Sequence, residues 1–98
     1  MWFRKWREKR RLEKLEAFDE LLSHLARSDD SCYSGMTVSE LKESVAAARR
    51  KFEAGDRMGI EDMRRLMVPT GPLQETSIDN GWGDEFLLIA DKLTYWHL

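Results

Sequence analysis

Apolar residues recur along this chain at spacings of three and four, the pattern produced by one face of an α-helix. The first such stretch contains no Gly or Pro from Trp2 to Arg27, and its apolar stripe consists of Leu12, Leu15, Phe18, Leu22 and Leu25. It predicts a long first helix over residues 2–27. Polar residues typical of turns follow at 28–31 and 34–35, so we expect the chain to turn there.

A second helix is predicted over residues 38–54, where a capping signal precedes a regular apolar stripe. The Thr37 hydroxyl can accept from the Glu40 amide, while the Glu40 side chain can reach back to the Thr37 amide. The stripe continues to Gly55, a residue suited to the left-handed conformation that ends many helices. Its members are Val38, Leu41, Val45, Ala48 and Phe52.

Two further helices are predicted in the second half of the chain. The third spans residues 59–67 and is closed by Pro69. The fourth spans residues 82–96, with Leu87, Leu88 and Ala90 widening its apolar stripe. Since no stretch shows the alternation of a strand, we expect an all-α fold: residues 1–98 form a single small domain of about four helices.

Residues 68–81 are predicted to form a long ordered loop between the third and fourth helices. Pro69 and Pro72 stiffen this segment, and Leu73 and Ile78 can anchor it in the core. A turn signal at residues 79–81 precedes the fourth helix. A connection of this length is unusual in a small helical protein, so it needs such anchors.

The C-terminal third resembles that of small, largely uncharacterised bacterial helical proteins, some of the toxin-neutralising immunity type. The resemblance rests on Pro69-Thr70-Gly71-Pro72-Leu73-Gln74-Glu75 followed by Asn80-Gly81-Trp82-Gly83-Asp84-Glu85-Phe86, about 20 residues of 98. It implies a non-enzymatic protein that binds a basic partner such as a toxin. No catalytic residue comes with it, and the N-terminal segment lies outside it.

Acidic residues cluster around the predicted loop, and no Lys or Arg occurs from Pro69 to Ala90 to neutralise them. We expect a surface for a basic protein partner, with Trp82 as an aromatic anchor. The alternative is that the carboxylates only cap the fourth helix and Trp82 belongs to the core. The acidic members of this candidate site are Glu75, Asp79, Asp84 and Glu85.

The net charge of −2 hides a division within the chain. Residues 1–14 carry seven basic and two acidic side chains, whereas residues 15–98 carry nine basic and sixteen acidic ones. Residues 1–11 therefore form a basic head, in which Trp2 and Trp6 point away from the predicted core stripe. We expect this head to anchor the chain on an anionic membrane surface or an acidic partner, unless it frays or packs on a second subunit. The anchor residues are Trp2, Arg4, Lys5, Trp6 and Arg7.

The sequence predicts no catalytic, cofactor or metal site. Residues 79–84 do not form a calcium loop, because glycines stand at two of the ligand positions. Glu16, Glu20 and His24 form a row on the first helix, but no other helix supplies matching metal ligands. Arg49-Arg50-Lys51 is interpreted as a solvated helix end, and the acidic body disfavours nucleic acid. The sequence favours a cytoplasmic protein. It has a single cysteine, no apolar run long enough to cross a bilayer and no signal peptide.

The pattern as a whole favours a helical protein-binding module without enzymatic activity. Its acidic body is expected to bind a basic partner. The alternative is a peripheral membrane or scaffold protein held by its N-terminal Trp and basic residues.

Overall fold

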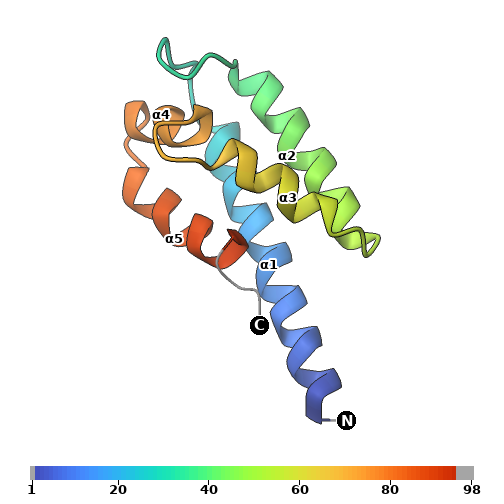
Figure 1. Ribbon diagram of the computed structural model, residues 1–98. Coiled ribbons are helices and arrows are strands. Elements are labelled where there is room, and N and C mark those ends of the chain that lie inside the picture. The colour runs from blue at the N-terminus through green and yellow to red at the C-terminus, as the bar shows by residue number, and fades with distance from the viewer. Residues whose placement is uncertain (1, 95–98) are drawn as a thin grey trace.

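A computed structural model describes residues 2–94, which form five helices and no strand (Figure 1). The all-α prediction is confirmed, although the chain has one helix more than expected. The helices are α1 (Trp2–Ala26), α2 (Val38–Glu53), α3 (Met58–Leu66), α4 (Pro72–Asp79) and α5 (Gly83–Thr94). Residues 95 and 96 of the predicted fourth helix, including Trp96, lie outside the described residues.

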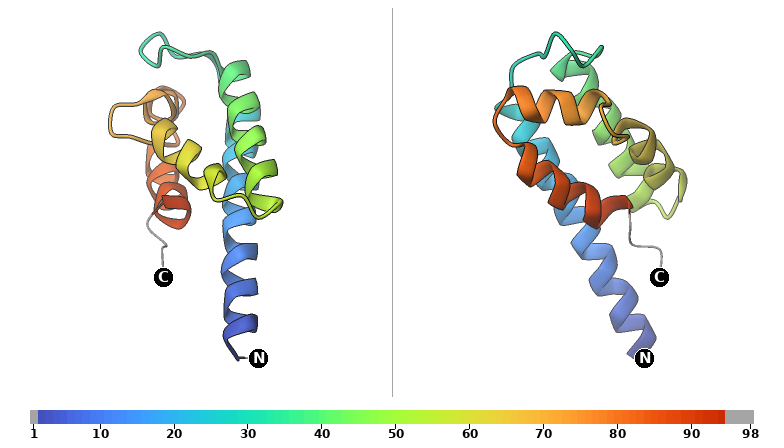
Figure 2. Two further views of the ribbon diagram at one scale, coloured as in Figure 1. Left: turned by 45° about the vertical axis from the view of Figure 1, so that its right-hand side comes forward. Right: turned by 60° about the vertical axis from the view of Figure 1, so that its left-hand side comes forward.

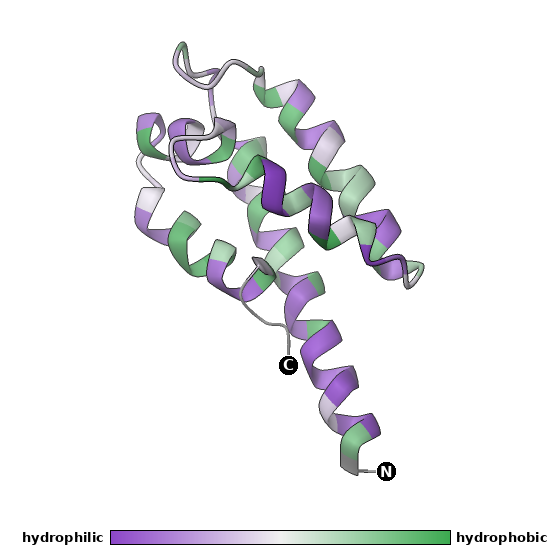
Figure 3. Cartoon of the chain, in the orientation of Figure 1, coloured by the Kyte–Doolittle hydropathy of each residue, from purple (hydrophilic) through white to green (hydrophobic). Residues whose placement is uncertain are grey.

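Helix α1 runs through the domain and then continues well past it (Figures 1 and 2). It packs against α2 and α5, and its buried side chains begin only at Leu15. The N-terminal part of α1 projects beyond the other four helices and is mostly hydrophilic (Figure 3). The molecule is therefore elongated, with extents of 48 × 23 × 21 Å.

The capping box of α2 is confirmed by two reciprocal hydrogen bonds. The Glu40 amide donates to Thr37 Oγ1 at 3.0 Å, and the Thr37 amide donates to Glu40 Oε1 at 2.8 Å. Asp30 adds a third contact, because its Oδ1 accepts from the Val38 amide at 2.7 Å. Gly55 has a φ of +86°, as expected for the residue that ends this helix.

Helices α2 and α3 approach closely at Gly59, which is buried. A Cβ atom at this position would lie 2.5 Å from the Ala48 carbonyl oxygen and 2.8 Å from the Phe52 nitrogen. Only glycine therefore fits without a backbone shift. This contact fixes how α3 lies across α2.

The prediction of a loop over residues 68–81 is wrong, because the segment contains α4. Gly71 is the residue before the helix and Pro72 occupies its first turn, where the missing amide hydrogen costs nothing. Thr70, with a φ of 60°, donates its amide hydrogen to Gln74 Oε1 at 2.7 Å. Leu73 is buried as predicted, whereas the second predicted anchor, Ile78, is 55% exposed.

One core joins all five helices, so the domain is single and compact. Its large buried side chains include Phe18, Leu25, Leu41, Met63 and Leu93. Three leucines assigned to apolar stripes from the sequence lie outside this core: Leu12 is 49% exposed, Leu87 56% and Leu88 66%. The helical period was right at these positions, but no neighbouring helix covers them.

Candidate binding surfaces

The motif around Asn80 and Trp82 joins two distant connections of the chain. Asn80 Oδ1 accepts from the Asp29 amide at 2.8 Å, and Asn80 Nδ2 donates to the Asp29 carbonyl at 2.9 Å. The same Nδ2 donates to the Thr76 carbonyl at the end of α4 at 2.9 Å. We call the contacts of residues 79–82 with residues 24–31 the clasp; it ties the α4–α5 turn to the end of α1.

Trp82 is part of the clasp and is only 5% exposed. Its indole N–H donates to Ser28 Oγ at 2.8 Å, and its ring stacks on His24 with centroids 4.7 Å apart. Phe86 packs edge-on at 6.5 Å. The prediction of Trp82 as an anchor for a partner is therefore corrected: the ring has no exposed face to offer, and the alternative that it belongs to the core is right.

The four predicted carboxylates do not act alike. Asp79 accepts from Ser31 Oγ within the clasp, and Glu75 is half-buried on α4. Asp84 and Glu85 are exposed in the first turn of α5, where carboxylates suit the helix dipole. Within residues 2–94, no cation pairs with Glu75, Asp84 or Glu85, which leaves their negative potential uncompensated.

Exposed apolar side chains stand beside these carboxylates. Leu87 and Leu88 lie one turn after Asp84, and Ile78 on α4 lies next to Gly83 at the start of α5. Asp91 continues the row by one more turn. We call this surface the acidic face; its members are Ile78, Asp84, Glu85, Leu87, Leu88 and Asp91.

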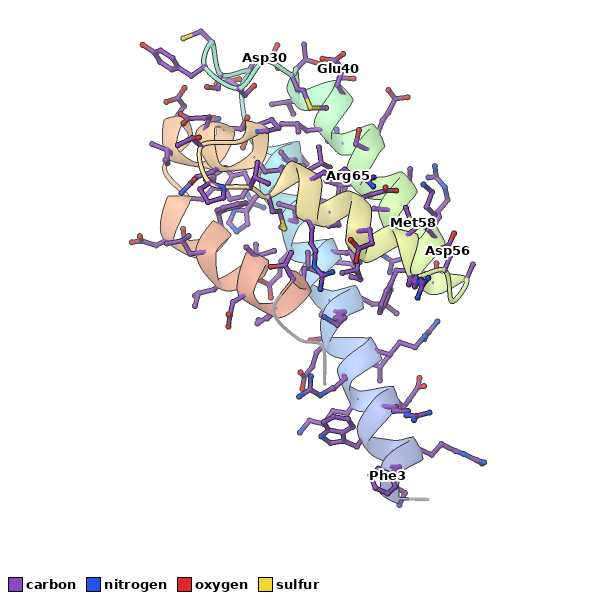
Figure 4. All side chains as sticks on the ribbon, viewed as in Figure 1. Phe3, Asp30, Glu40, Asp56, Met58 and Arg65 are labelled. Atoms are coloured by element: carbon purple, nitrogen blue, oxygen red, sulfur yellow. The ribbon has the colours of Figure 1, made fainter. Side chains whose placement is uncertain are left out.

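A groove of about 610 Å³ separates the projecting part of α1 from the turn between α2 and α3. Figure 4 shows its two limits, Phe3 near the tip of α1 and Asp56 in the turn. We call it the basic groove, because five cations and one carboxylate line it. The cations are Arg7, Arg10, Arg11, Lys14 and Arg57, and the large apolar side chains are Phe3, Trp6, Phe52 and Ile60.

Three of these cations already have partners within the protein. The Arg10 guanidinium lies over the Trp6 ring at 4.3 Å, a cation–π contact. Arg11 donates to the Glu53 carbonyl at 3.1 Å, and Lys14 Nζ donates to the Lys92 carbonyl at 3.0 Å. Of these contacts, the hydrogen bond from Arg11 to Glu53 joins α1 to the end of α2 across the groove.

Two cations, Arg7 and Arg57, have no such partner within residues 2–94. They come from opposite walls, Arg7 from α1 and Arg57 from the turn before α3. The single carboxylate, Asp56, uses Oδ1 to accept from the Met58 amide at 2.9 Å. The groove therefore combines an apolar floor with two guanidinium groups available to an anionic ligand.

The structure brings together only part of the predicted head. Trp6 and Arg7 line the basic groove, whereas Arg4 and Lys5 are exposed outside it, and the side chain of Trp2 lies outside the described part of the chain. Sequence reasoning missed Phe52, Arg57 and Ile60. Phe52 had been assigned to the apolar stripe of the second helix, and no local signal indicates that this turn reaches α1.

Other candidate chemistry is accounted for by structural contacts. Arg49 pairs with Asp19 at 2.9 Å and Lys51 with Asp62 at 2.7 Å, so acidic neighbours compensate this basic run. Glu20 lies 3.8 Å from Lys92. Among the described residues, no group of three or more potential ligands could hold a metal ion, and no helix has the length and apolar character to cross a membrane.

Comparison with known proteins gives no match to a family model, a curated protein or a solved structure. The resemblance of the C-terminal third to immunity-type proteins therefore stays a prediction. What the geometry does provide is two surfaces of opposite charge, each with exposed apolar side chains.

Proposed function

We propose that the protein is a non-enzymatic helical binding module of the immunity type whose acidic face binds a basic protein partner. The observation that carries the proposal is the exposure of Leu87 and Leu88, 56% and 66%, between Asp84 and Asp91. Exposed apolar side chains rimmed by polar and charged residues are typical of a protein-binding surface. The exposed Cys32 agrees with a reducing, cytoplasmic setting.

Each component of the acidic face has a separate role in this proposal. The leucines contribute most of the binding free energy, because their burial removes apolar surface from water. The carboxylates steer a basic partner and speed association, an effect that salt screens. Leu87 and Leu88 thus take the place that sequence reasoning gave to Trp82.

Site-specific crosslinking tests the proposal. With p-benzoylphenylalanine in place of Leu88, we expect crosslinks in cells to a protein that presents a basic surface, and we expect Asp84→Lys with Asp91→Lys to abolish them. The same group in place of Ser39, exposed on α2, serves as the control. Equal crosslinking from both positions, or none from position 88, would contradict the proposal.

A second candidate function is peripheral attachment to an anionic membrane through the head. It is favoured by the projection of α1 away from the acidic body, which allows the head to lie on a surface without bringing the carboxylates near it (Figure 2). Each Lys or Arg close to such a surface contributes about 1 kcal/mol. Arg4, Lys5 and Arg7 would face the lipid headgroups, with Trp6 and Trp2 as interfacial aromatics.

Flotation with liposomes tests this second function. We expect the full chain to float with liposomes rich in phosphatidylserine, whereas a chain lacking residues 1–11 stays at the bottom. The truncation removes no residue of the core, so circular dichroism is expected to show a folded domain. Equal behaviour of the two chains, or flotation with purely zwitterionic liposomes, would leave the anionic-membrane function without support.

A further inference from the structure

The acidic face and the basic groove lie on opposite sides of one chain. In Figure 1, α5 forms one edge of the molecule and the α2–α3 turn the other, and α1 and α3 lie between them. Neither surface can therefore satisfy the other within one molecule. Both combine exposed apolar side chains with uncompensated charge, and the charges are opposite.

We infer that the occupant of the basic groove is the acidic face of a second copy of this chain. The inference rests on the proposed function of the acidic face and names the basic surface that it binds. In this contact α5 of one copy lies along the projecting part of α1 of the next. The arrangement is a helix-in-groove interface between identical chains.

The dimensions of the two surfaces agree. Helix α5 has 12 residues, and the part of α1 that lines the groove also spans 12 positions, from Phe3 to Lys14. At 1.5 Å per residue, each is roughly 18 Å long. One helix can therefore cover the groove along its whole length.

The side chains are complementary as well. Leu87 and Leu88 are placed to cover Trp6 and Phe52, the exposed and half-buried rings of the groove floor. Two separated carboxylates, Asp84 and Asp91, then face the two guanidinium groups without partners in the described chain. Bidentate pairing of guanidinium with carboxylate is the strongest ion pair available to such side chains.

The contact uses different surfaces on the two copies, so it is heterologous. One copy of a pair keeps a free acidic face and the other keeps a free groove, so further copies can add head to tail. The net charge of only −2 favours this assembly, because the copies repel each other weakly overall. Low salt strengthens the contact and high salt weakens it.

Two charge-reversal variants test the inference by sedimentation of the full chain. The groove variant carries Arg7→Glu and Arg57→Glu, and the face variant carries Asp84→Lys and Asp91→Lys. We expect the wild type to associate with increasing concentration at low salt and to dissociate at about 0.5 M NaCl, where charges are strongly screened. Each variant alone is expected to associate at least about tenfold more weakly, because charges of like sign then meet at the contact.

An equal mixture of the two variants provides the decisive measurement. The reversed groove of one matches the reversed face of the other, so the mixture is expected to associate again. As a matched control, Lys9→Glu with Lys42→Glu changes two exposed cations outside the groove and gives the same net charge as the groove variant, so it should associate like the wild type.

A monomeric wild type, or a mixture that stays monomeric, would overturn self-association. In that case crosslinking from position 88 to a different basic protein would still support the proposed function, so the two failures are distinguishable. Liposome binding by a monomeric wild type would likewise overturn it and would support attachment of the head to a membrane. If a reversal variant fails to fold, Leu88→Gln replaces it, because this substitution keeps all charges. The inference requires Leu88→Gln to weaken association. Unchanged association of Leu88→Gln would also overturn the inference.

Discussion

Lys14 shows how a single charged side chain can join helices at the centre of this protein. It lies on α1 and donates from Nζ to the carbonyls of Lys92 and Leu93, at 3.0 and 3.3 Å, near the end of α5. Cations stabilise such helix ends, where carbonyl groups lack partners within the helix. Burial, together with the smaller effects of the Arg10 and Arg64 charges, lowers the pKa of Lys14 to about 8.

The depressed pKa of Lys14 makes stability depend on pH. Above pH 8 the native state loses the proton, while the unfolded state keeps it until about pH 10.5. The free energy of unfolding that Lys14 contributes therefore rises between pH 8 and 10.5. We expect the difference in urea midpoint between wild type and Lys14→Met to grow in favour of wild type from pH 7 to pH 9.5. A difference that does not change with pH would show that Lys14 has an ordinary pKa in the folded protein.

At the scale of elements, the clasp determines where α4 and α5 lie relative to α1. Its hydrogen bonds connect positions 51 and 54 residues apart, from Asn80 to Asp29 and from Trp82 to Ser28. Helix α4 has only 8 residues, too short to be stable alone, so its position depends on such contacts. The Asn80–Trp82 motif that precedes α5 therefore has a structural role.

Asn80→Ala is expected to destabilise the domain by about 1–3 kcal/mol, because it leaves the Asp29 amide and two carbonyls without their partner. Urea unfolding followed by circular dichroism measures this loss. Ser39→Ala, at an exposed position without a side-chain hydrogen bond in the described chain, is the control and should stay within about 0.5 kcal/mol of wild type. Equal midpoints for the two variants would mean that the clasp contributes no net stability.

At the scale of the whole molecule, all five helices share one core. The basic groove along α1 and the acidic face on α5 lie on opposite sides of it. Leu41 is fully buried in that core, whereas Leu12 on α1 is half exposed. Both leucines belong to helical stripes in the sequence, so only the packing of the helices distinguishes them. Their substitution therefore tests the tertiary structure directly.

Leu41→Asp is expected to abolish cooperative unfolding, because a buried, unpaired carboxylate costs several kcal/mol against the roughly 5–10 kcal/mol of a small domain. Leu12→Asp should leave the melting temperature nearly unchanged. Thermal melts followed by circular dichroism compare the two. A folded Leu41→Asp variant, or an unfolded Leu12→Asp variant, would contradict the packing described here.

The sequence alone determined the features that depend on neighbours three or four positions away. These include the helical periods of α1, α2, α3 and α5, the capping box at Thr37 and the turn at Gly55. Such features are local, because hydrogen bonds and side-chain contacts along a helix join residues within one turn of each other. The same locality explains why α4 was missed: two of its three buried residues, Thr76 and Ser77, are polar and give no apolar period.

Only the tertiary structure decided which side of each helix is covered. It buried Trp82 against His24, exposed Leu87 and Leu88, and brought Phe52 and Arg57 to the side of Trp6 and Arg7. A helical stripe in the sequence shows that one face of a helix is apolar, but the neighbouring helices determine whether that face is buried. Both candidate surfaces arise from this difference, because their side chains meet across positions that no local pattern connects.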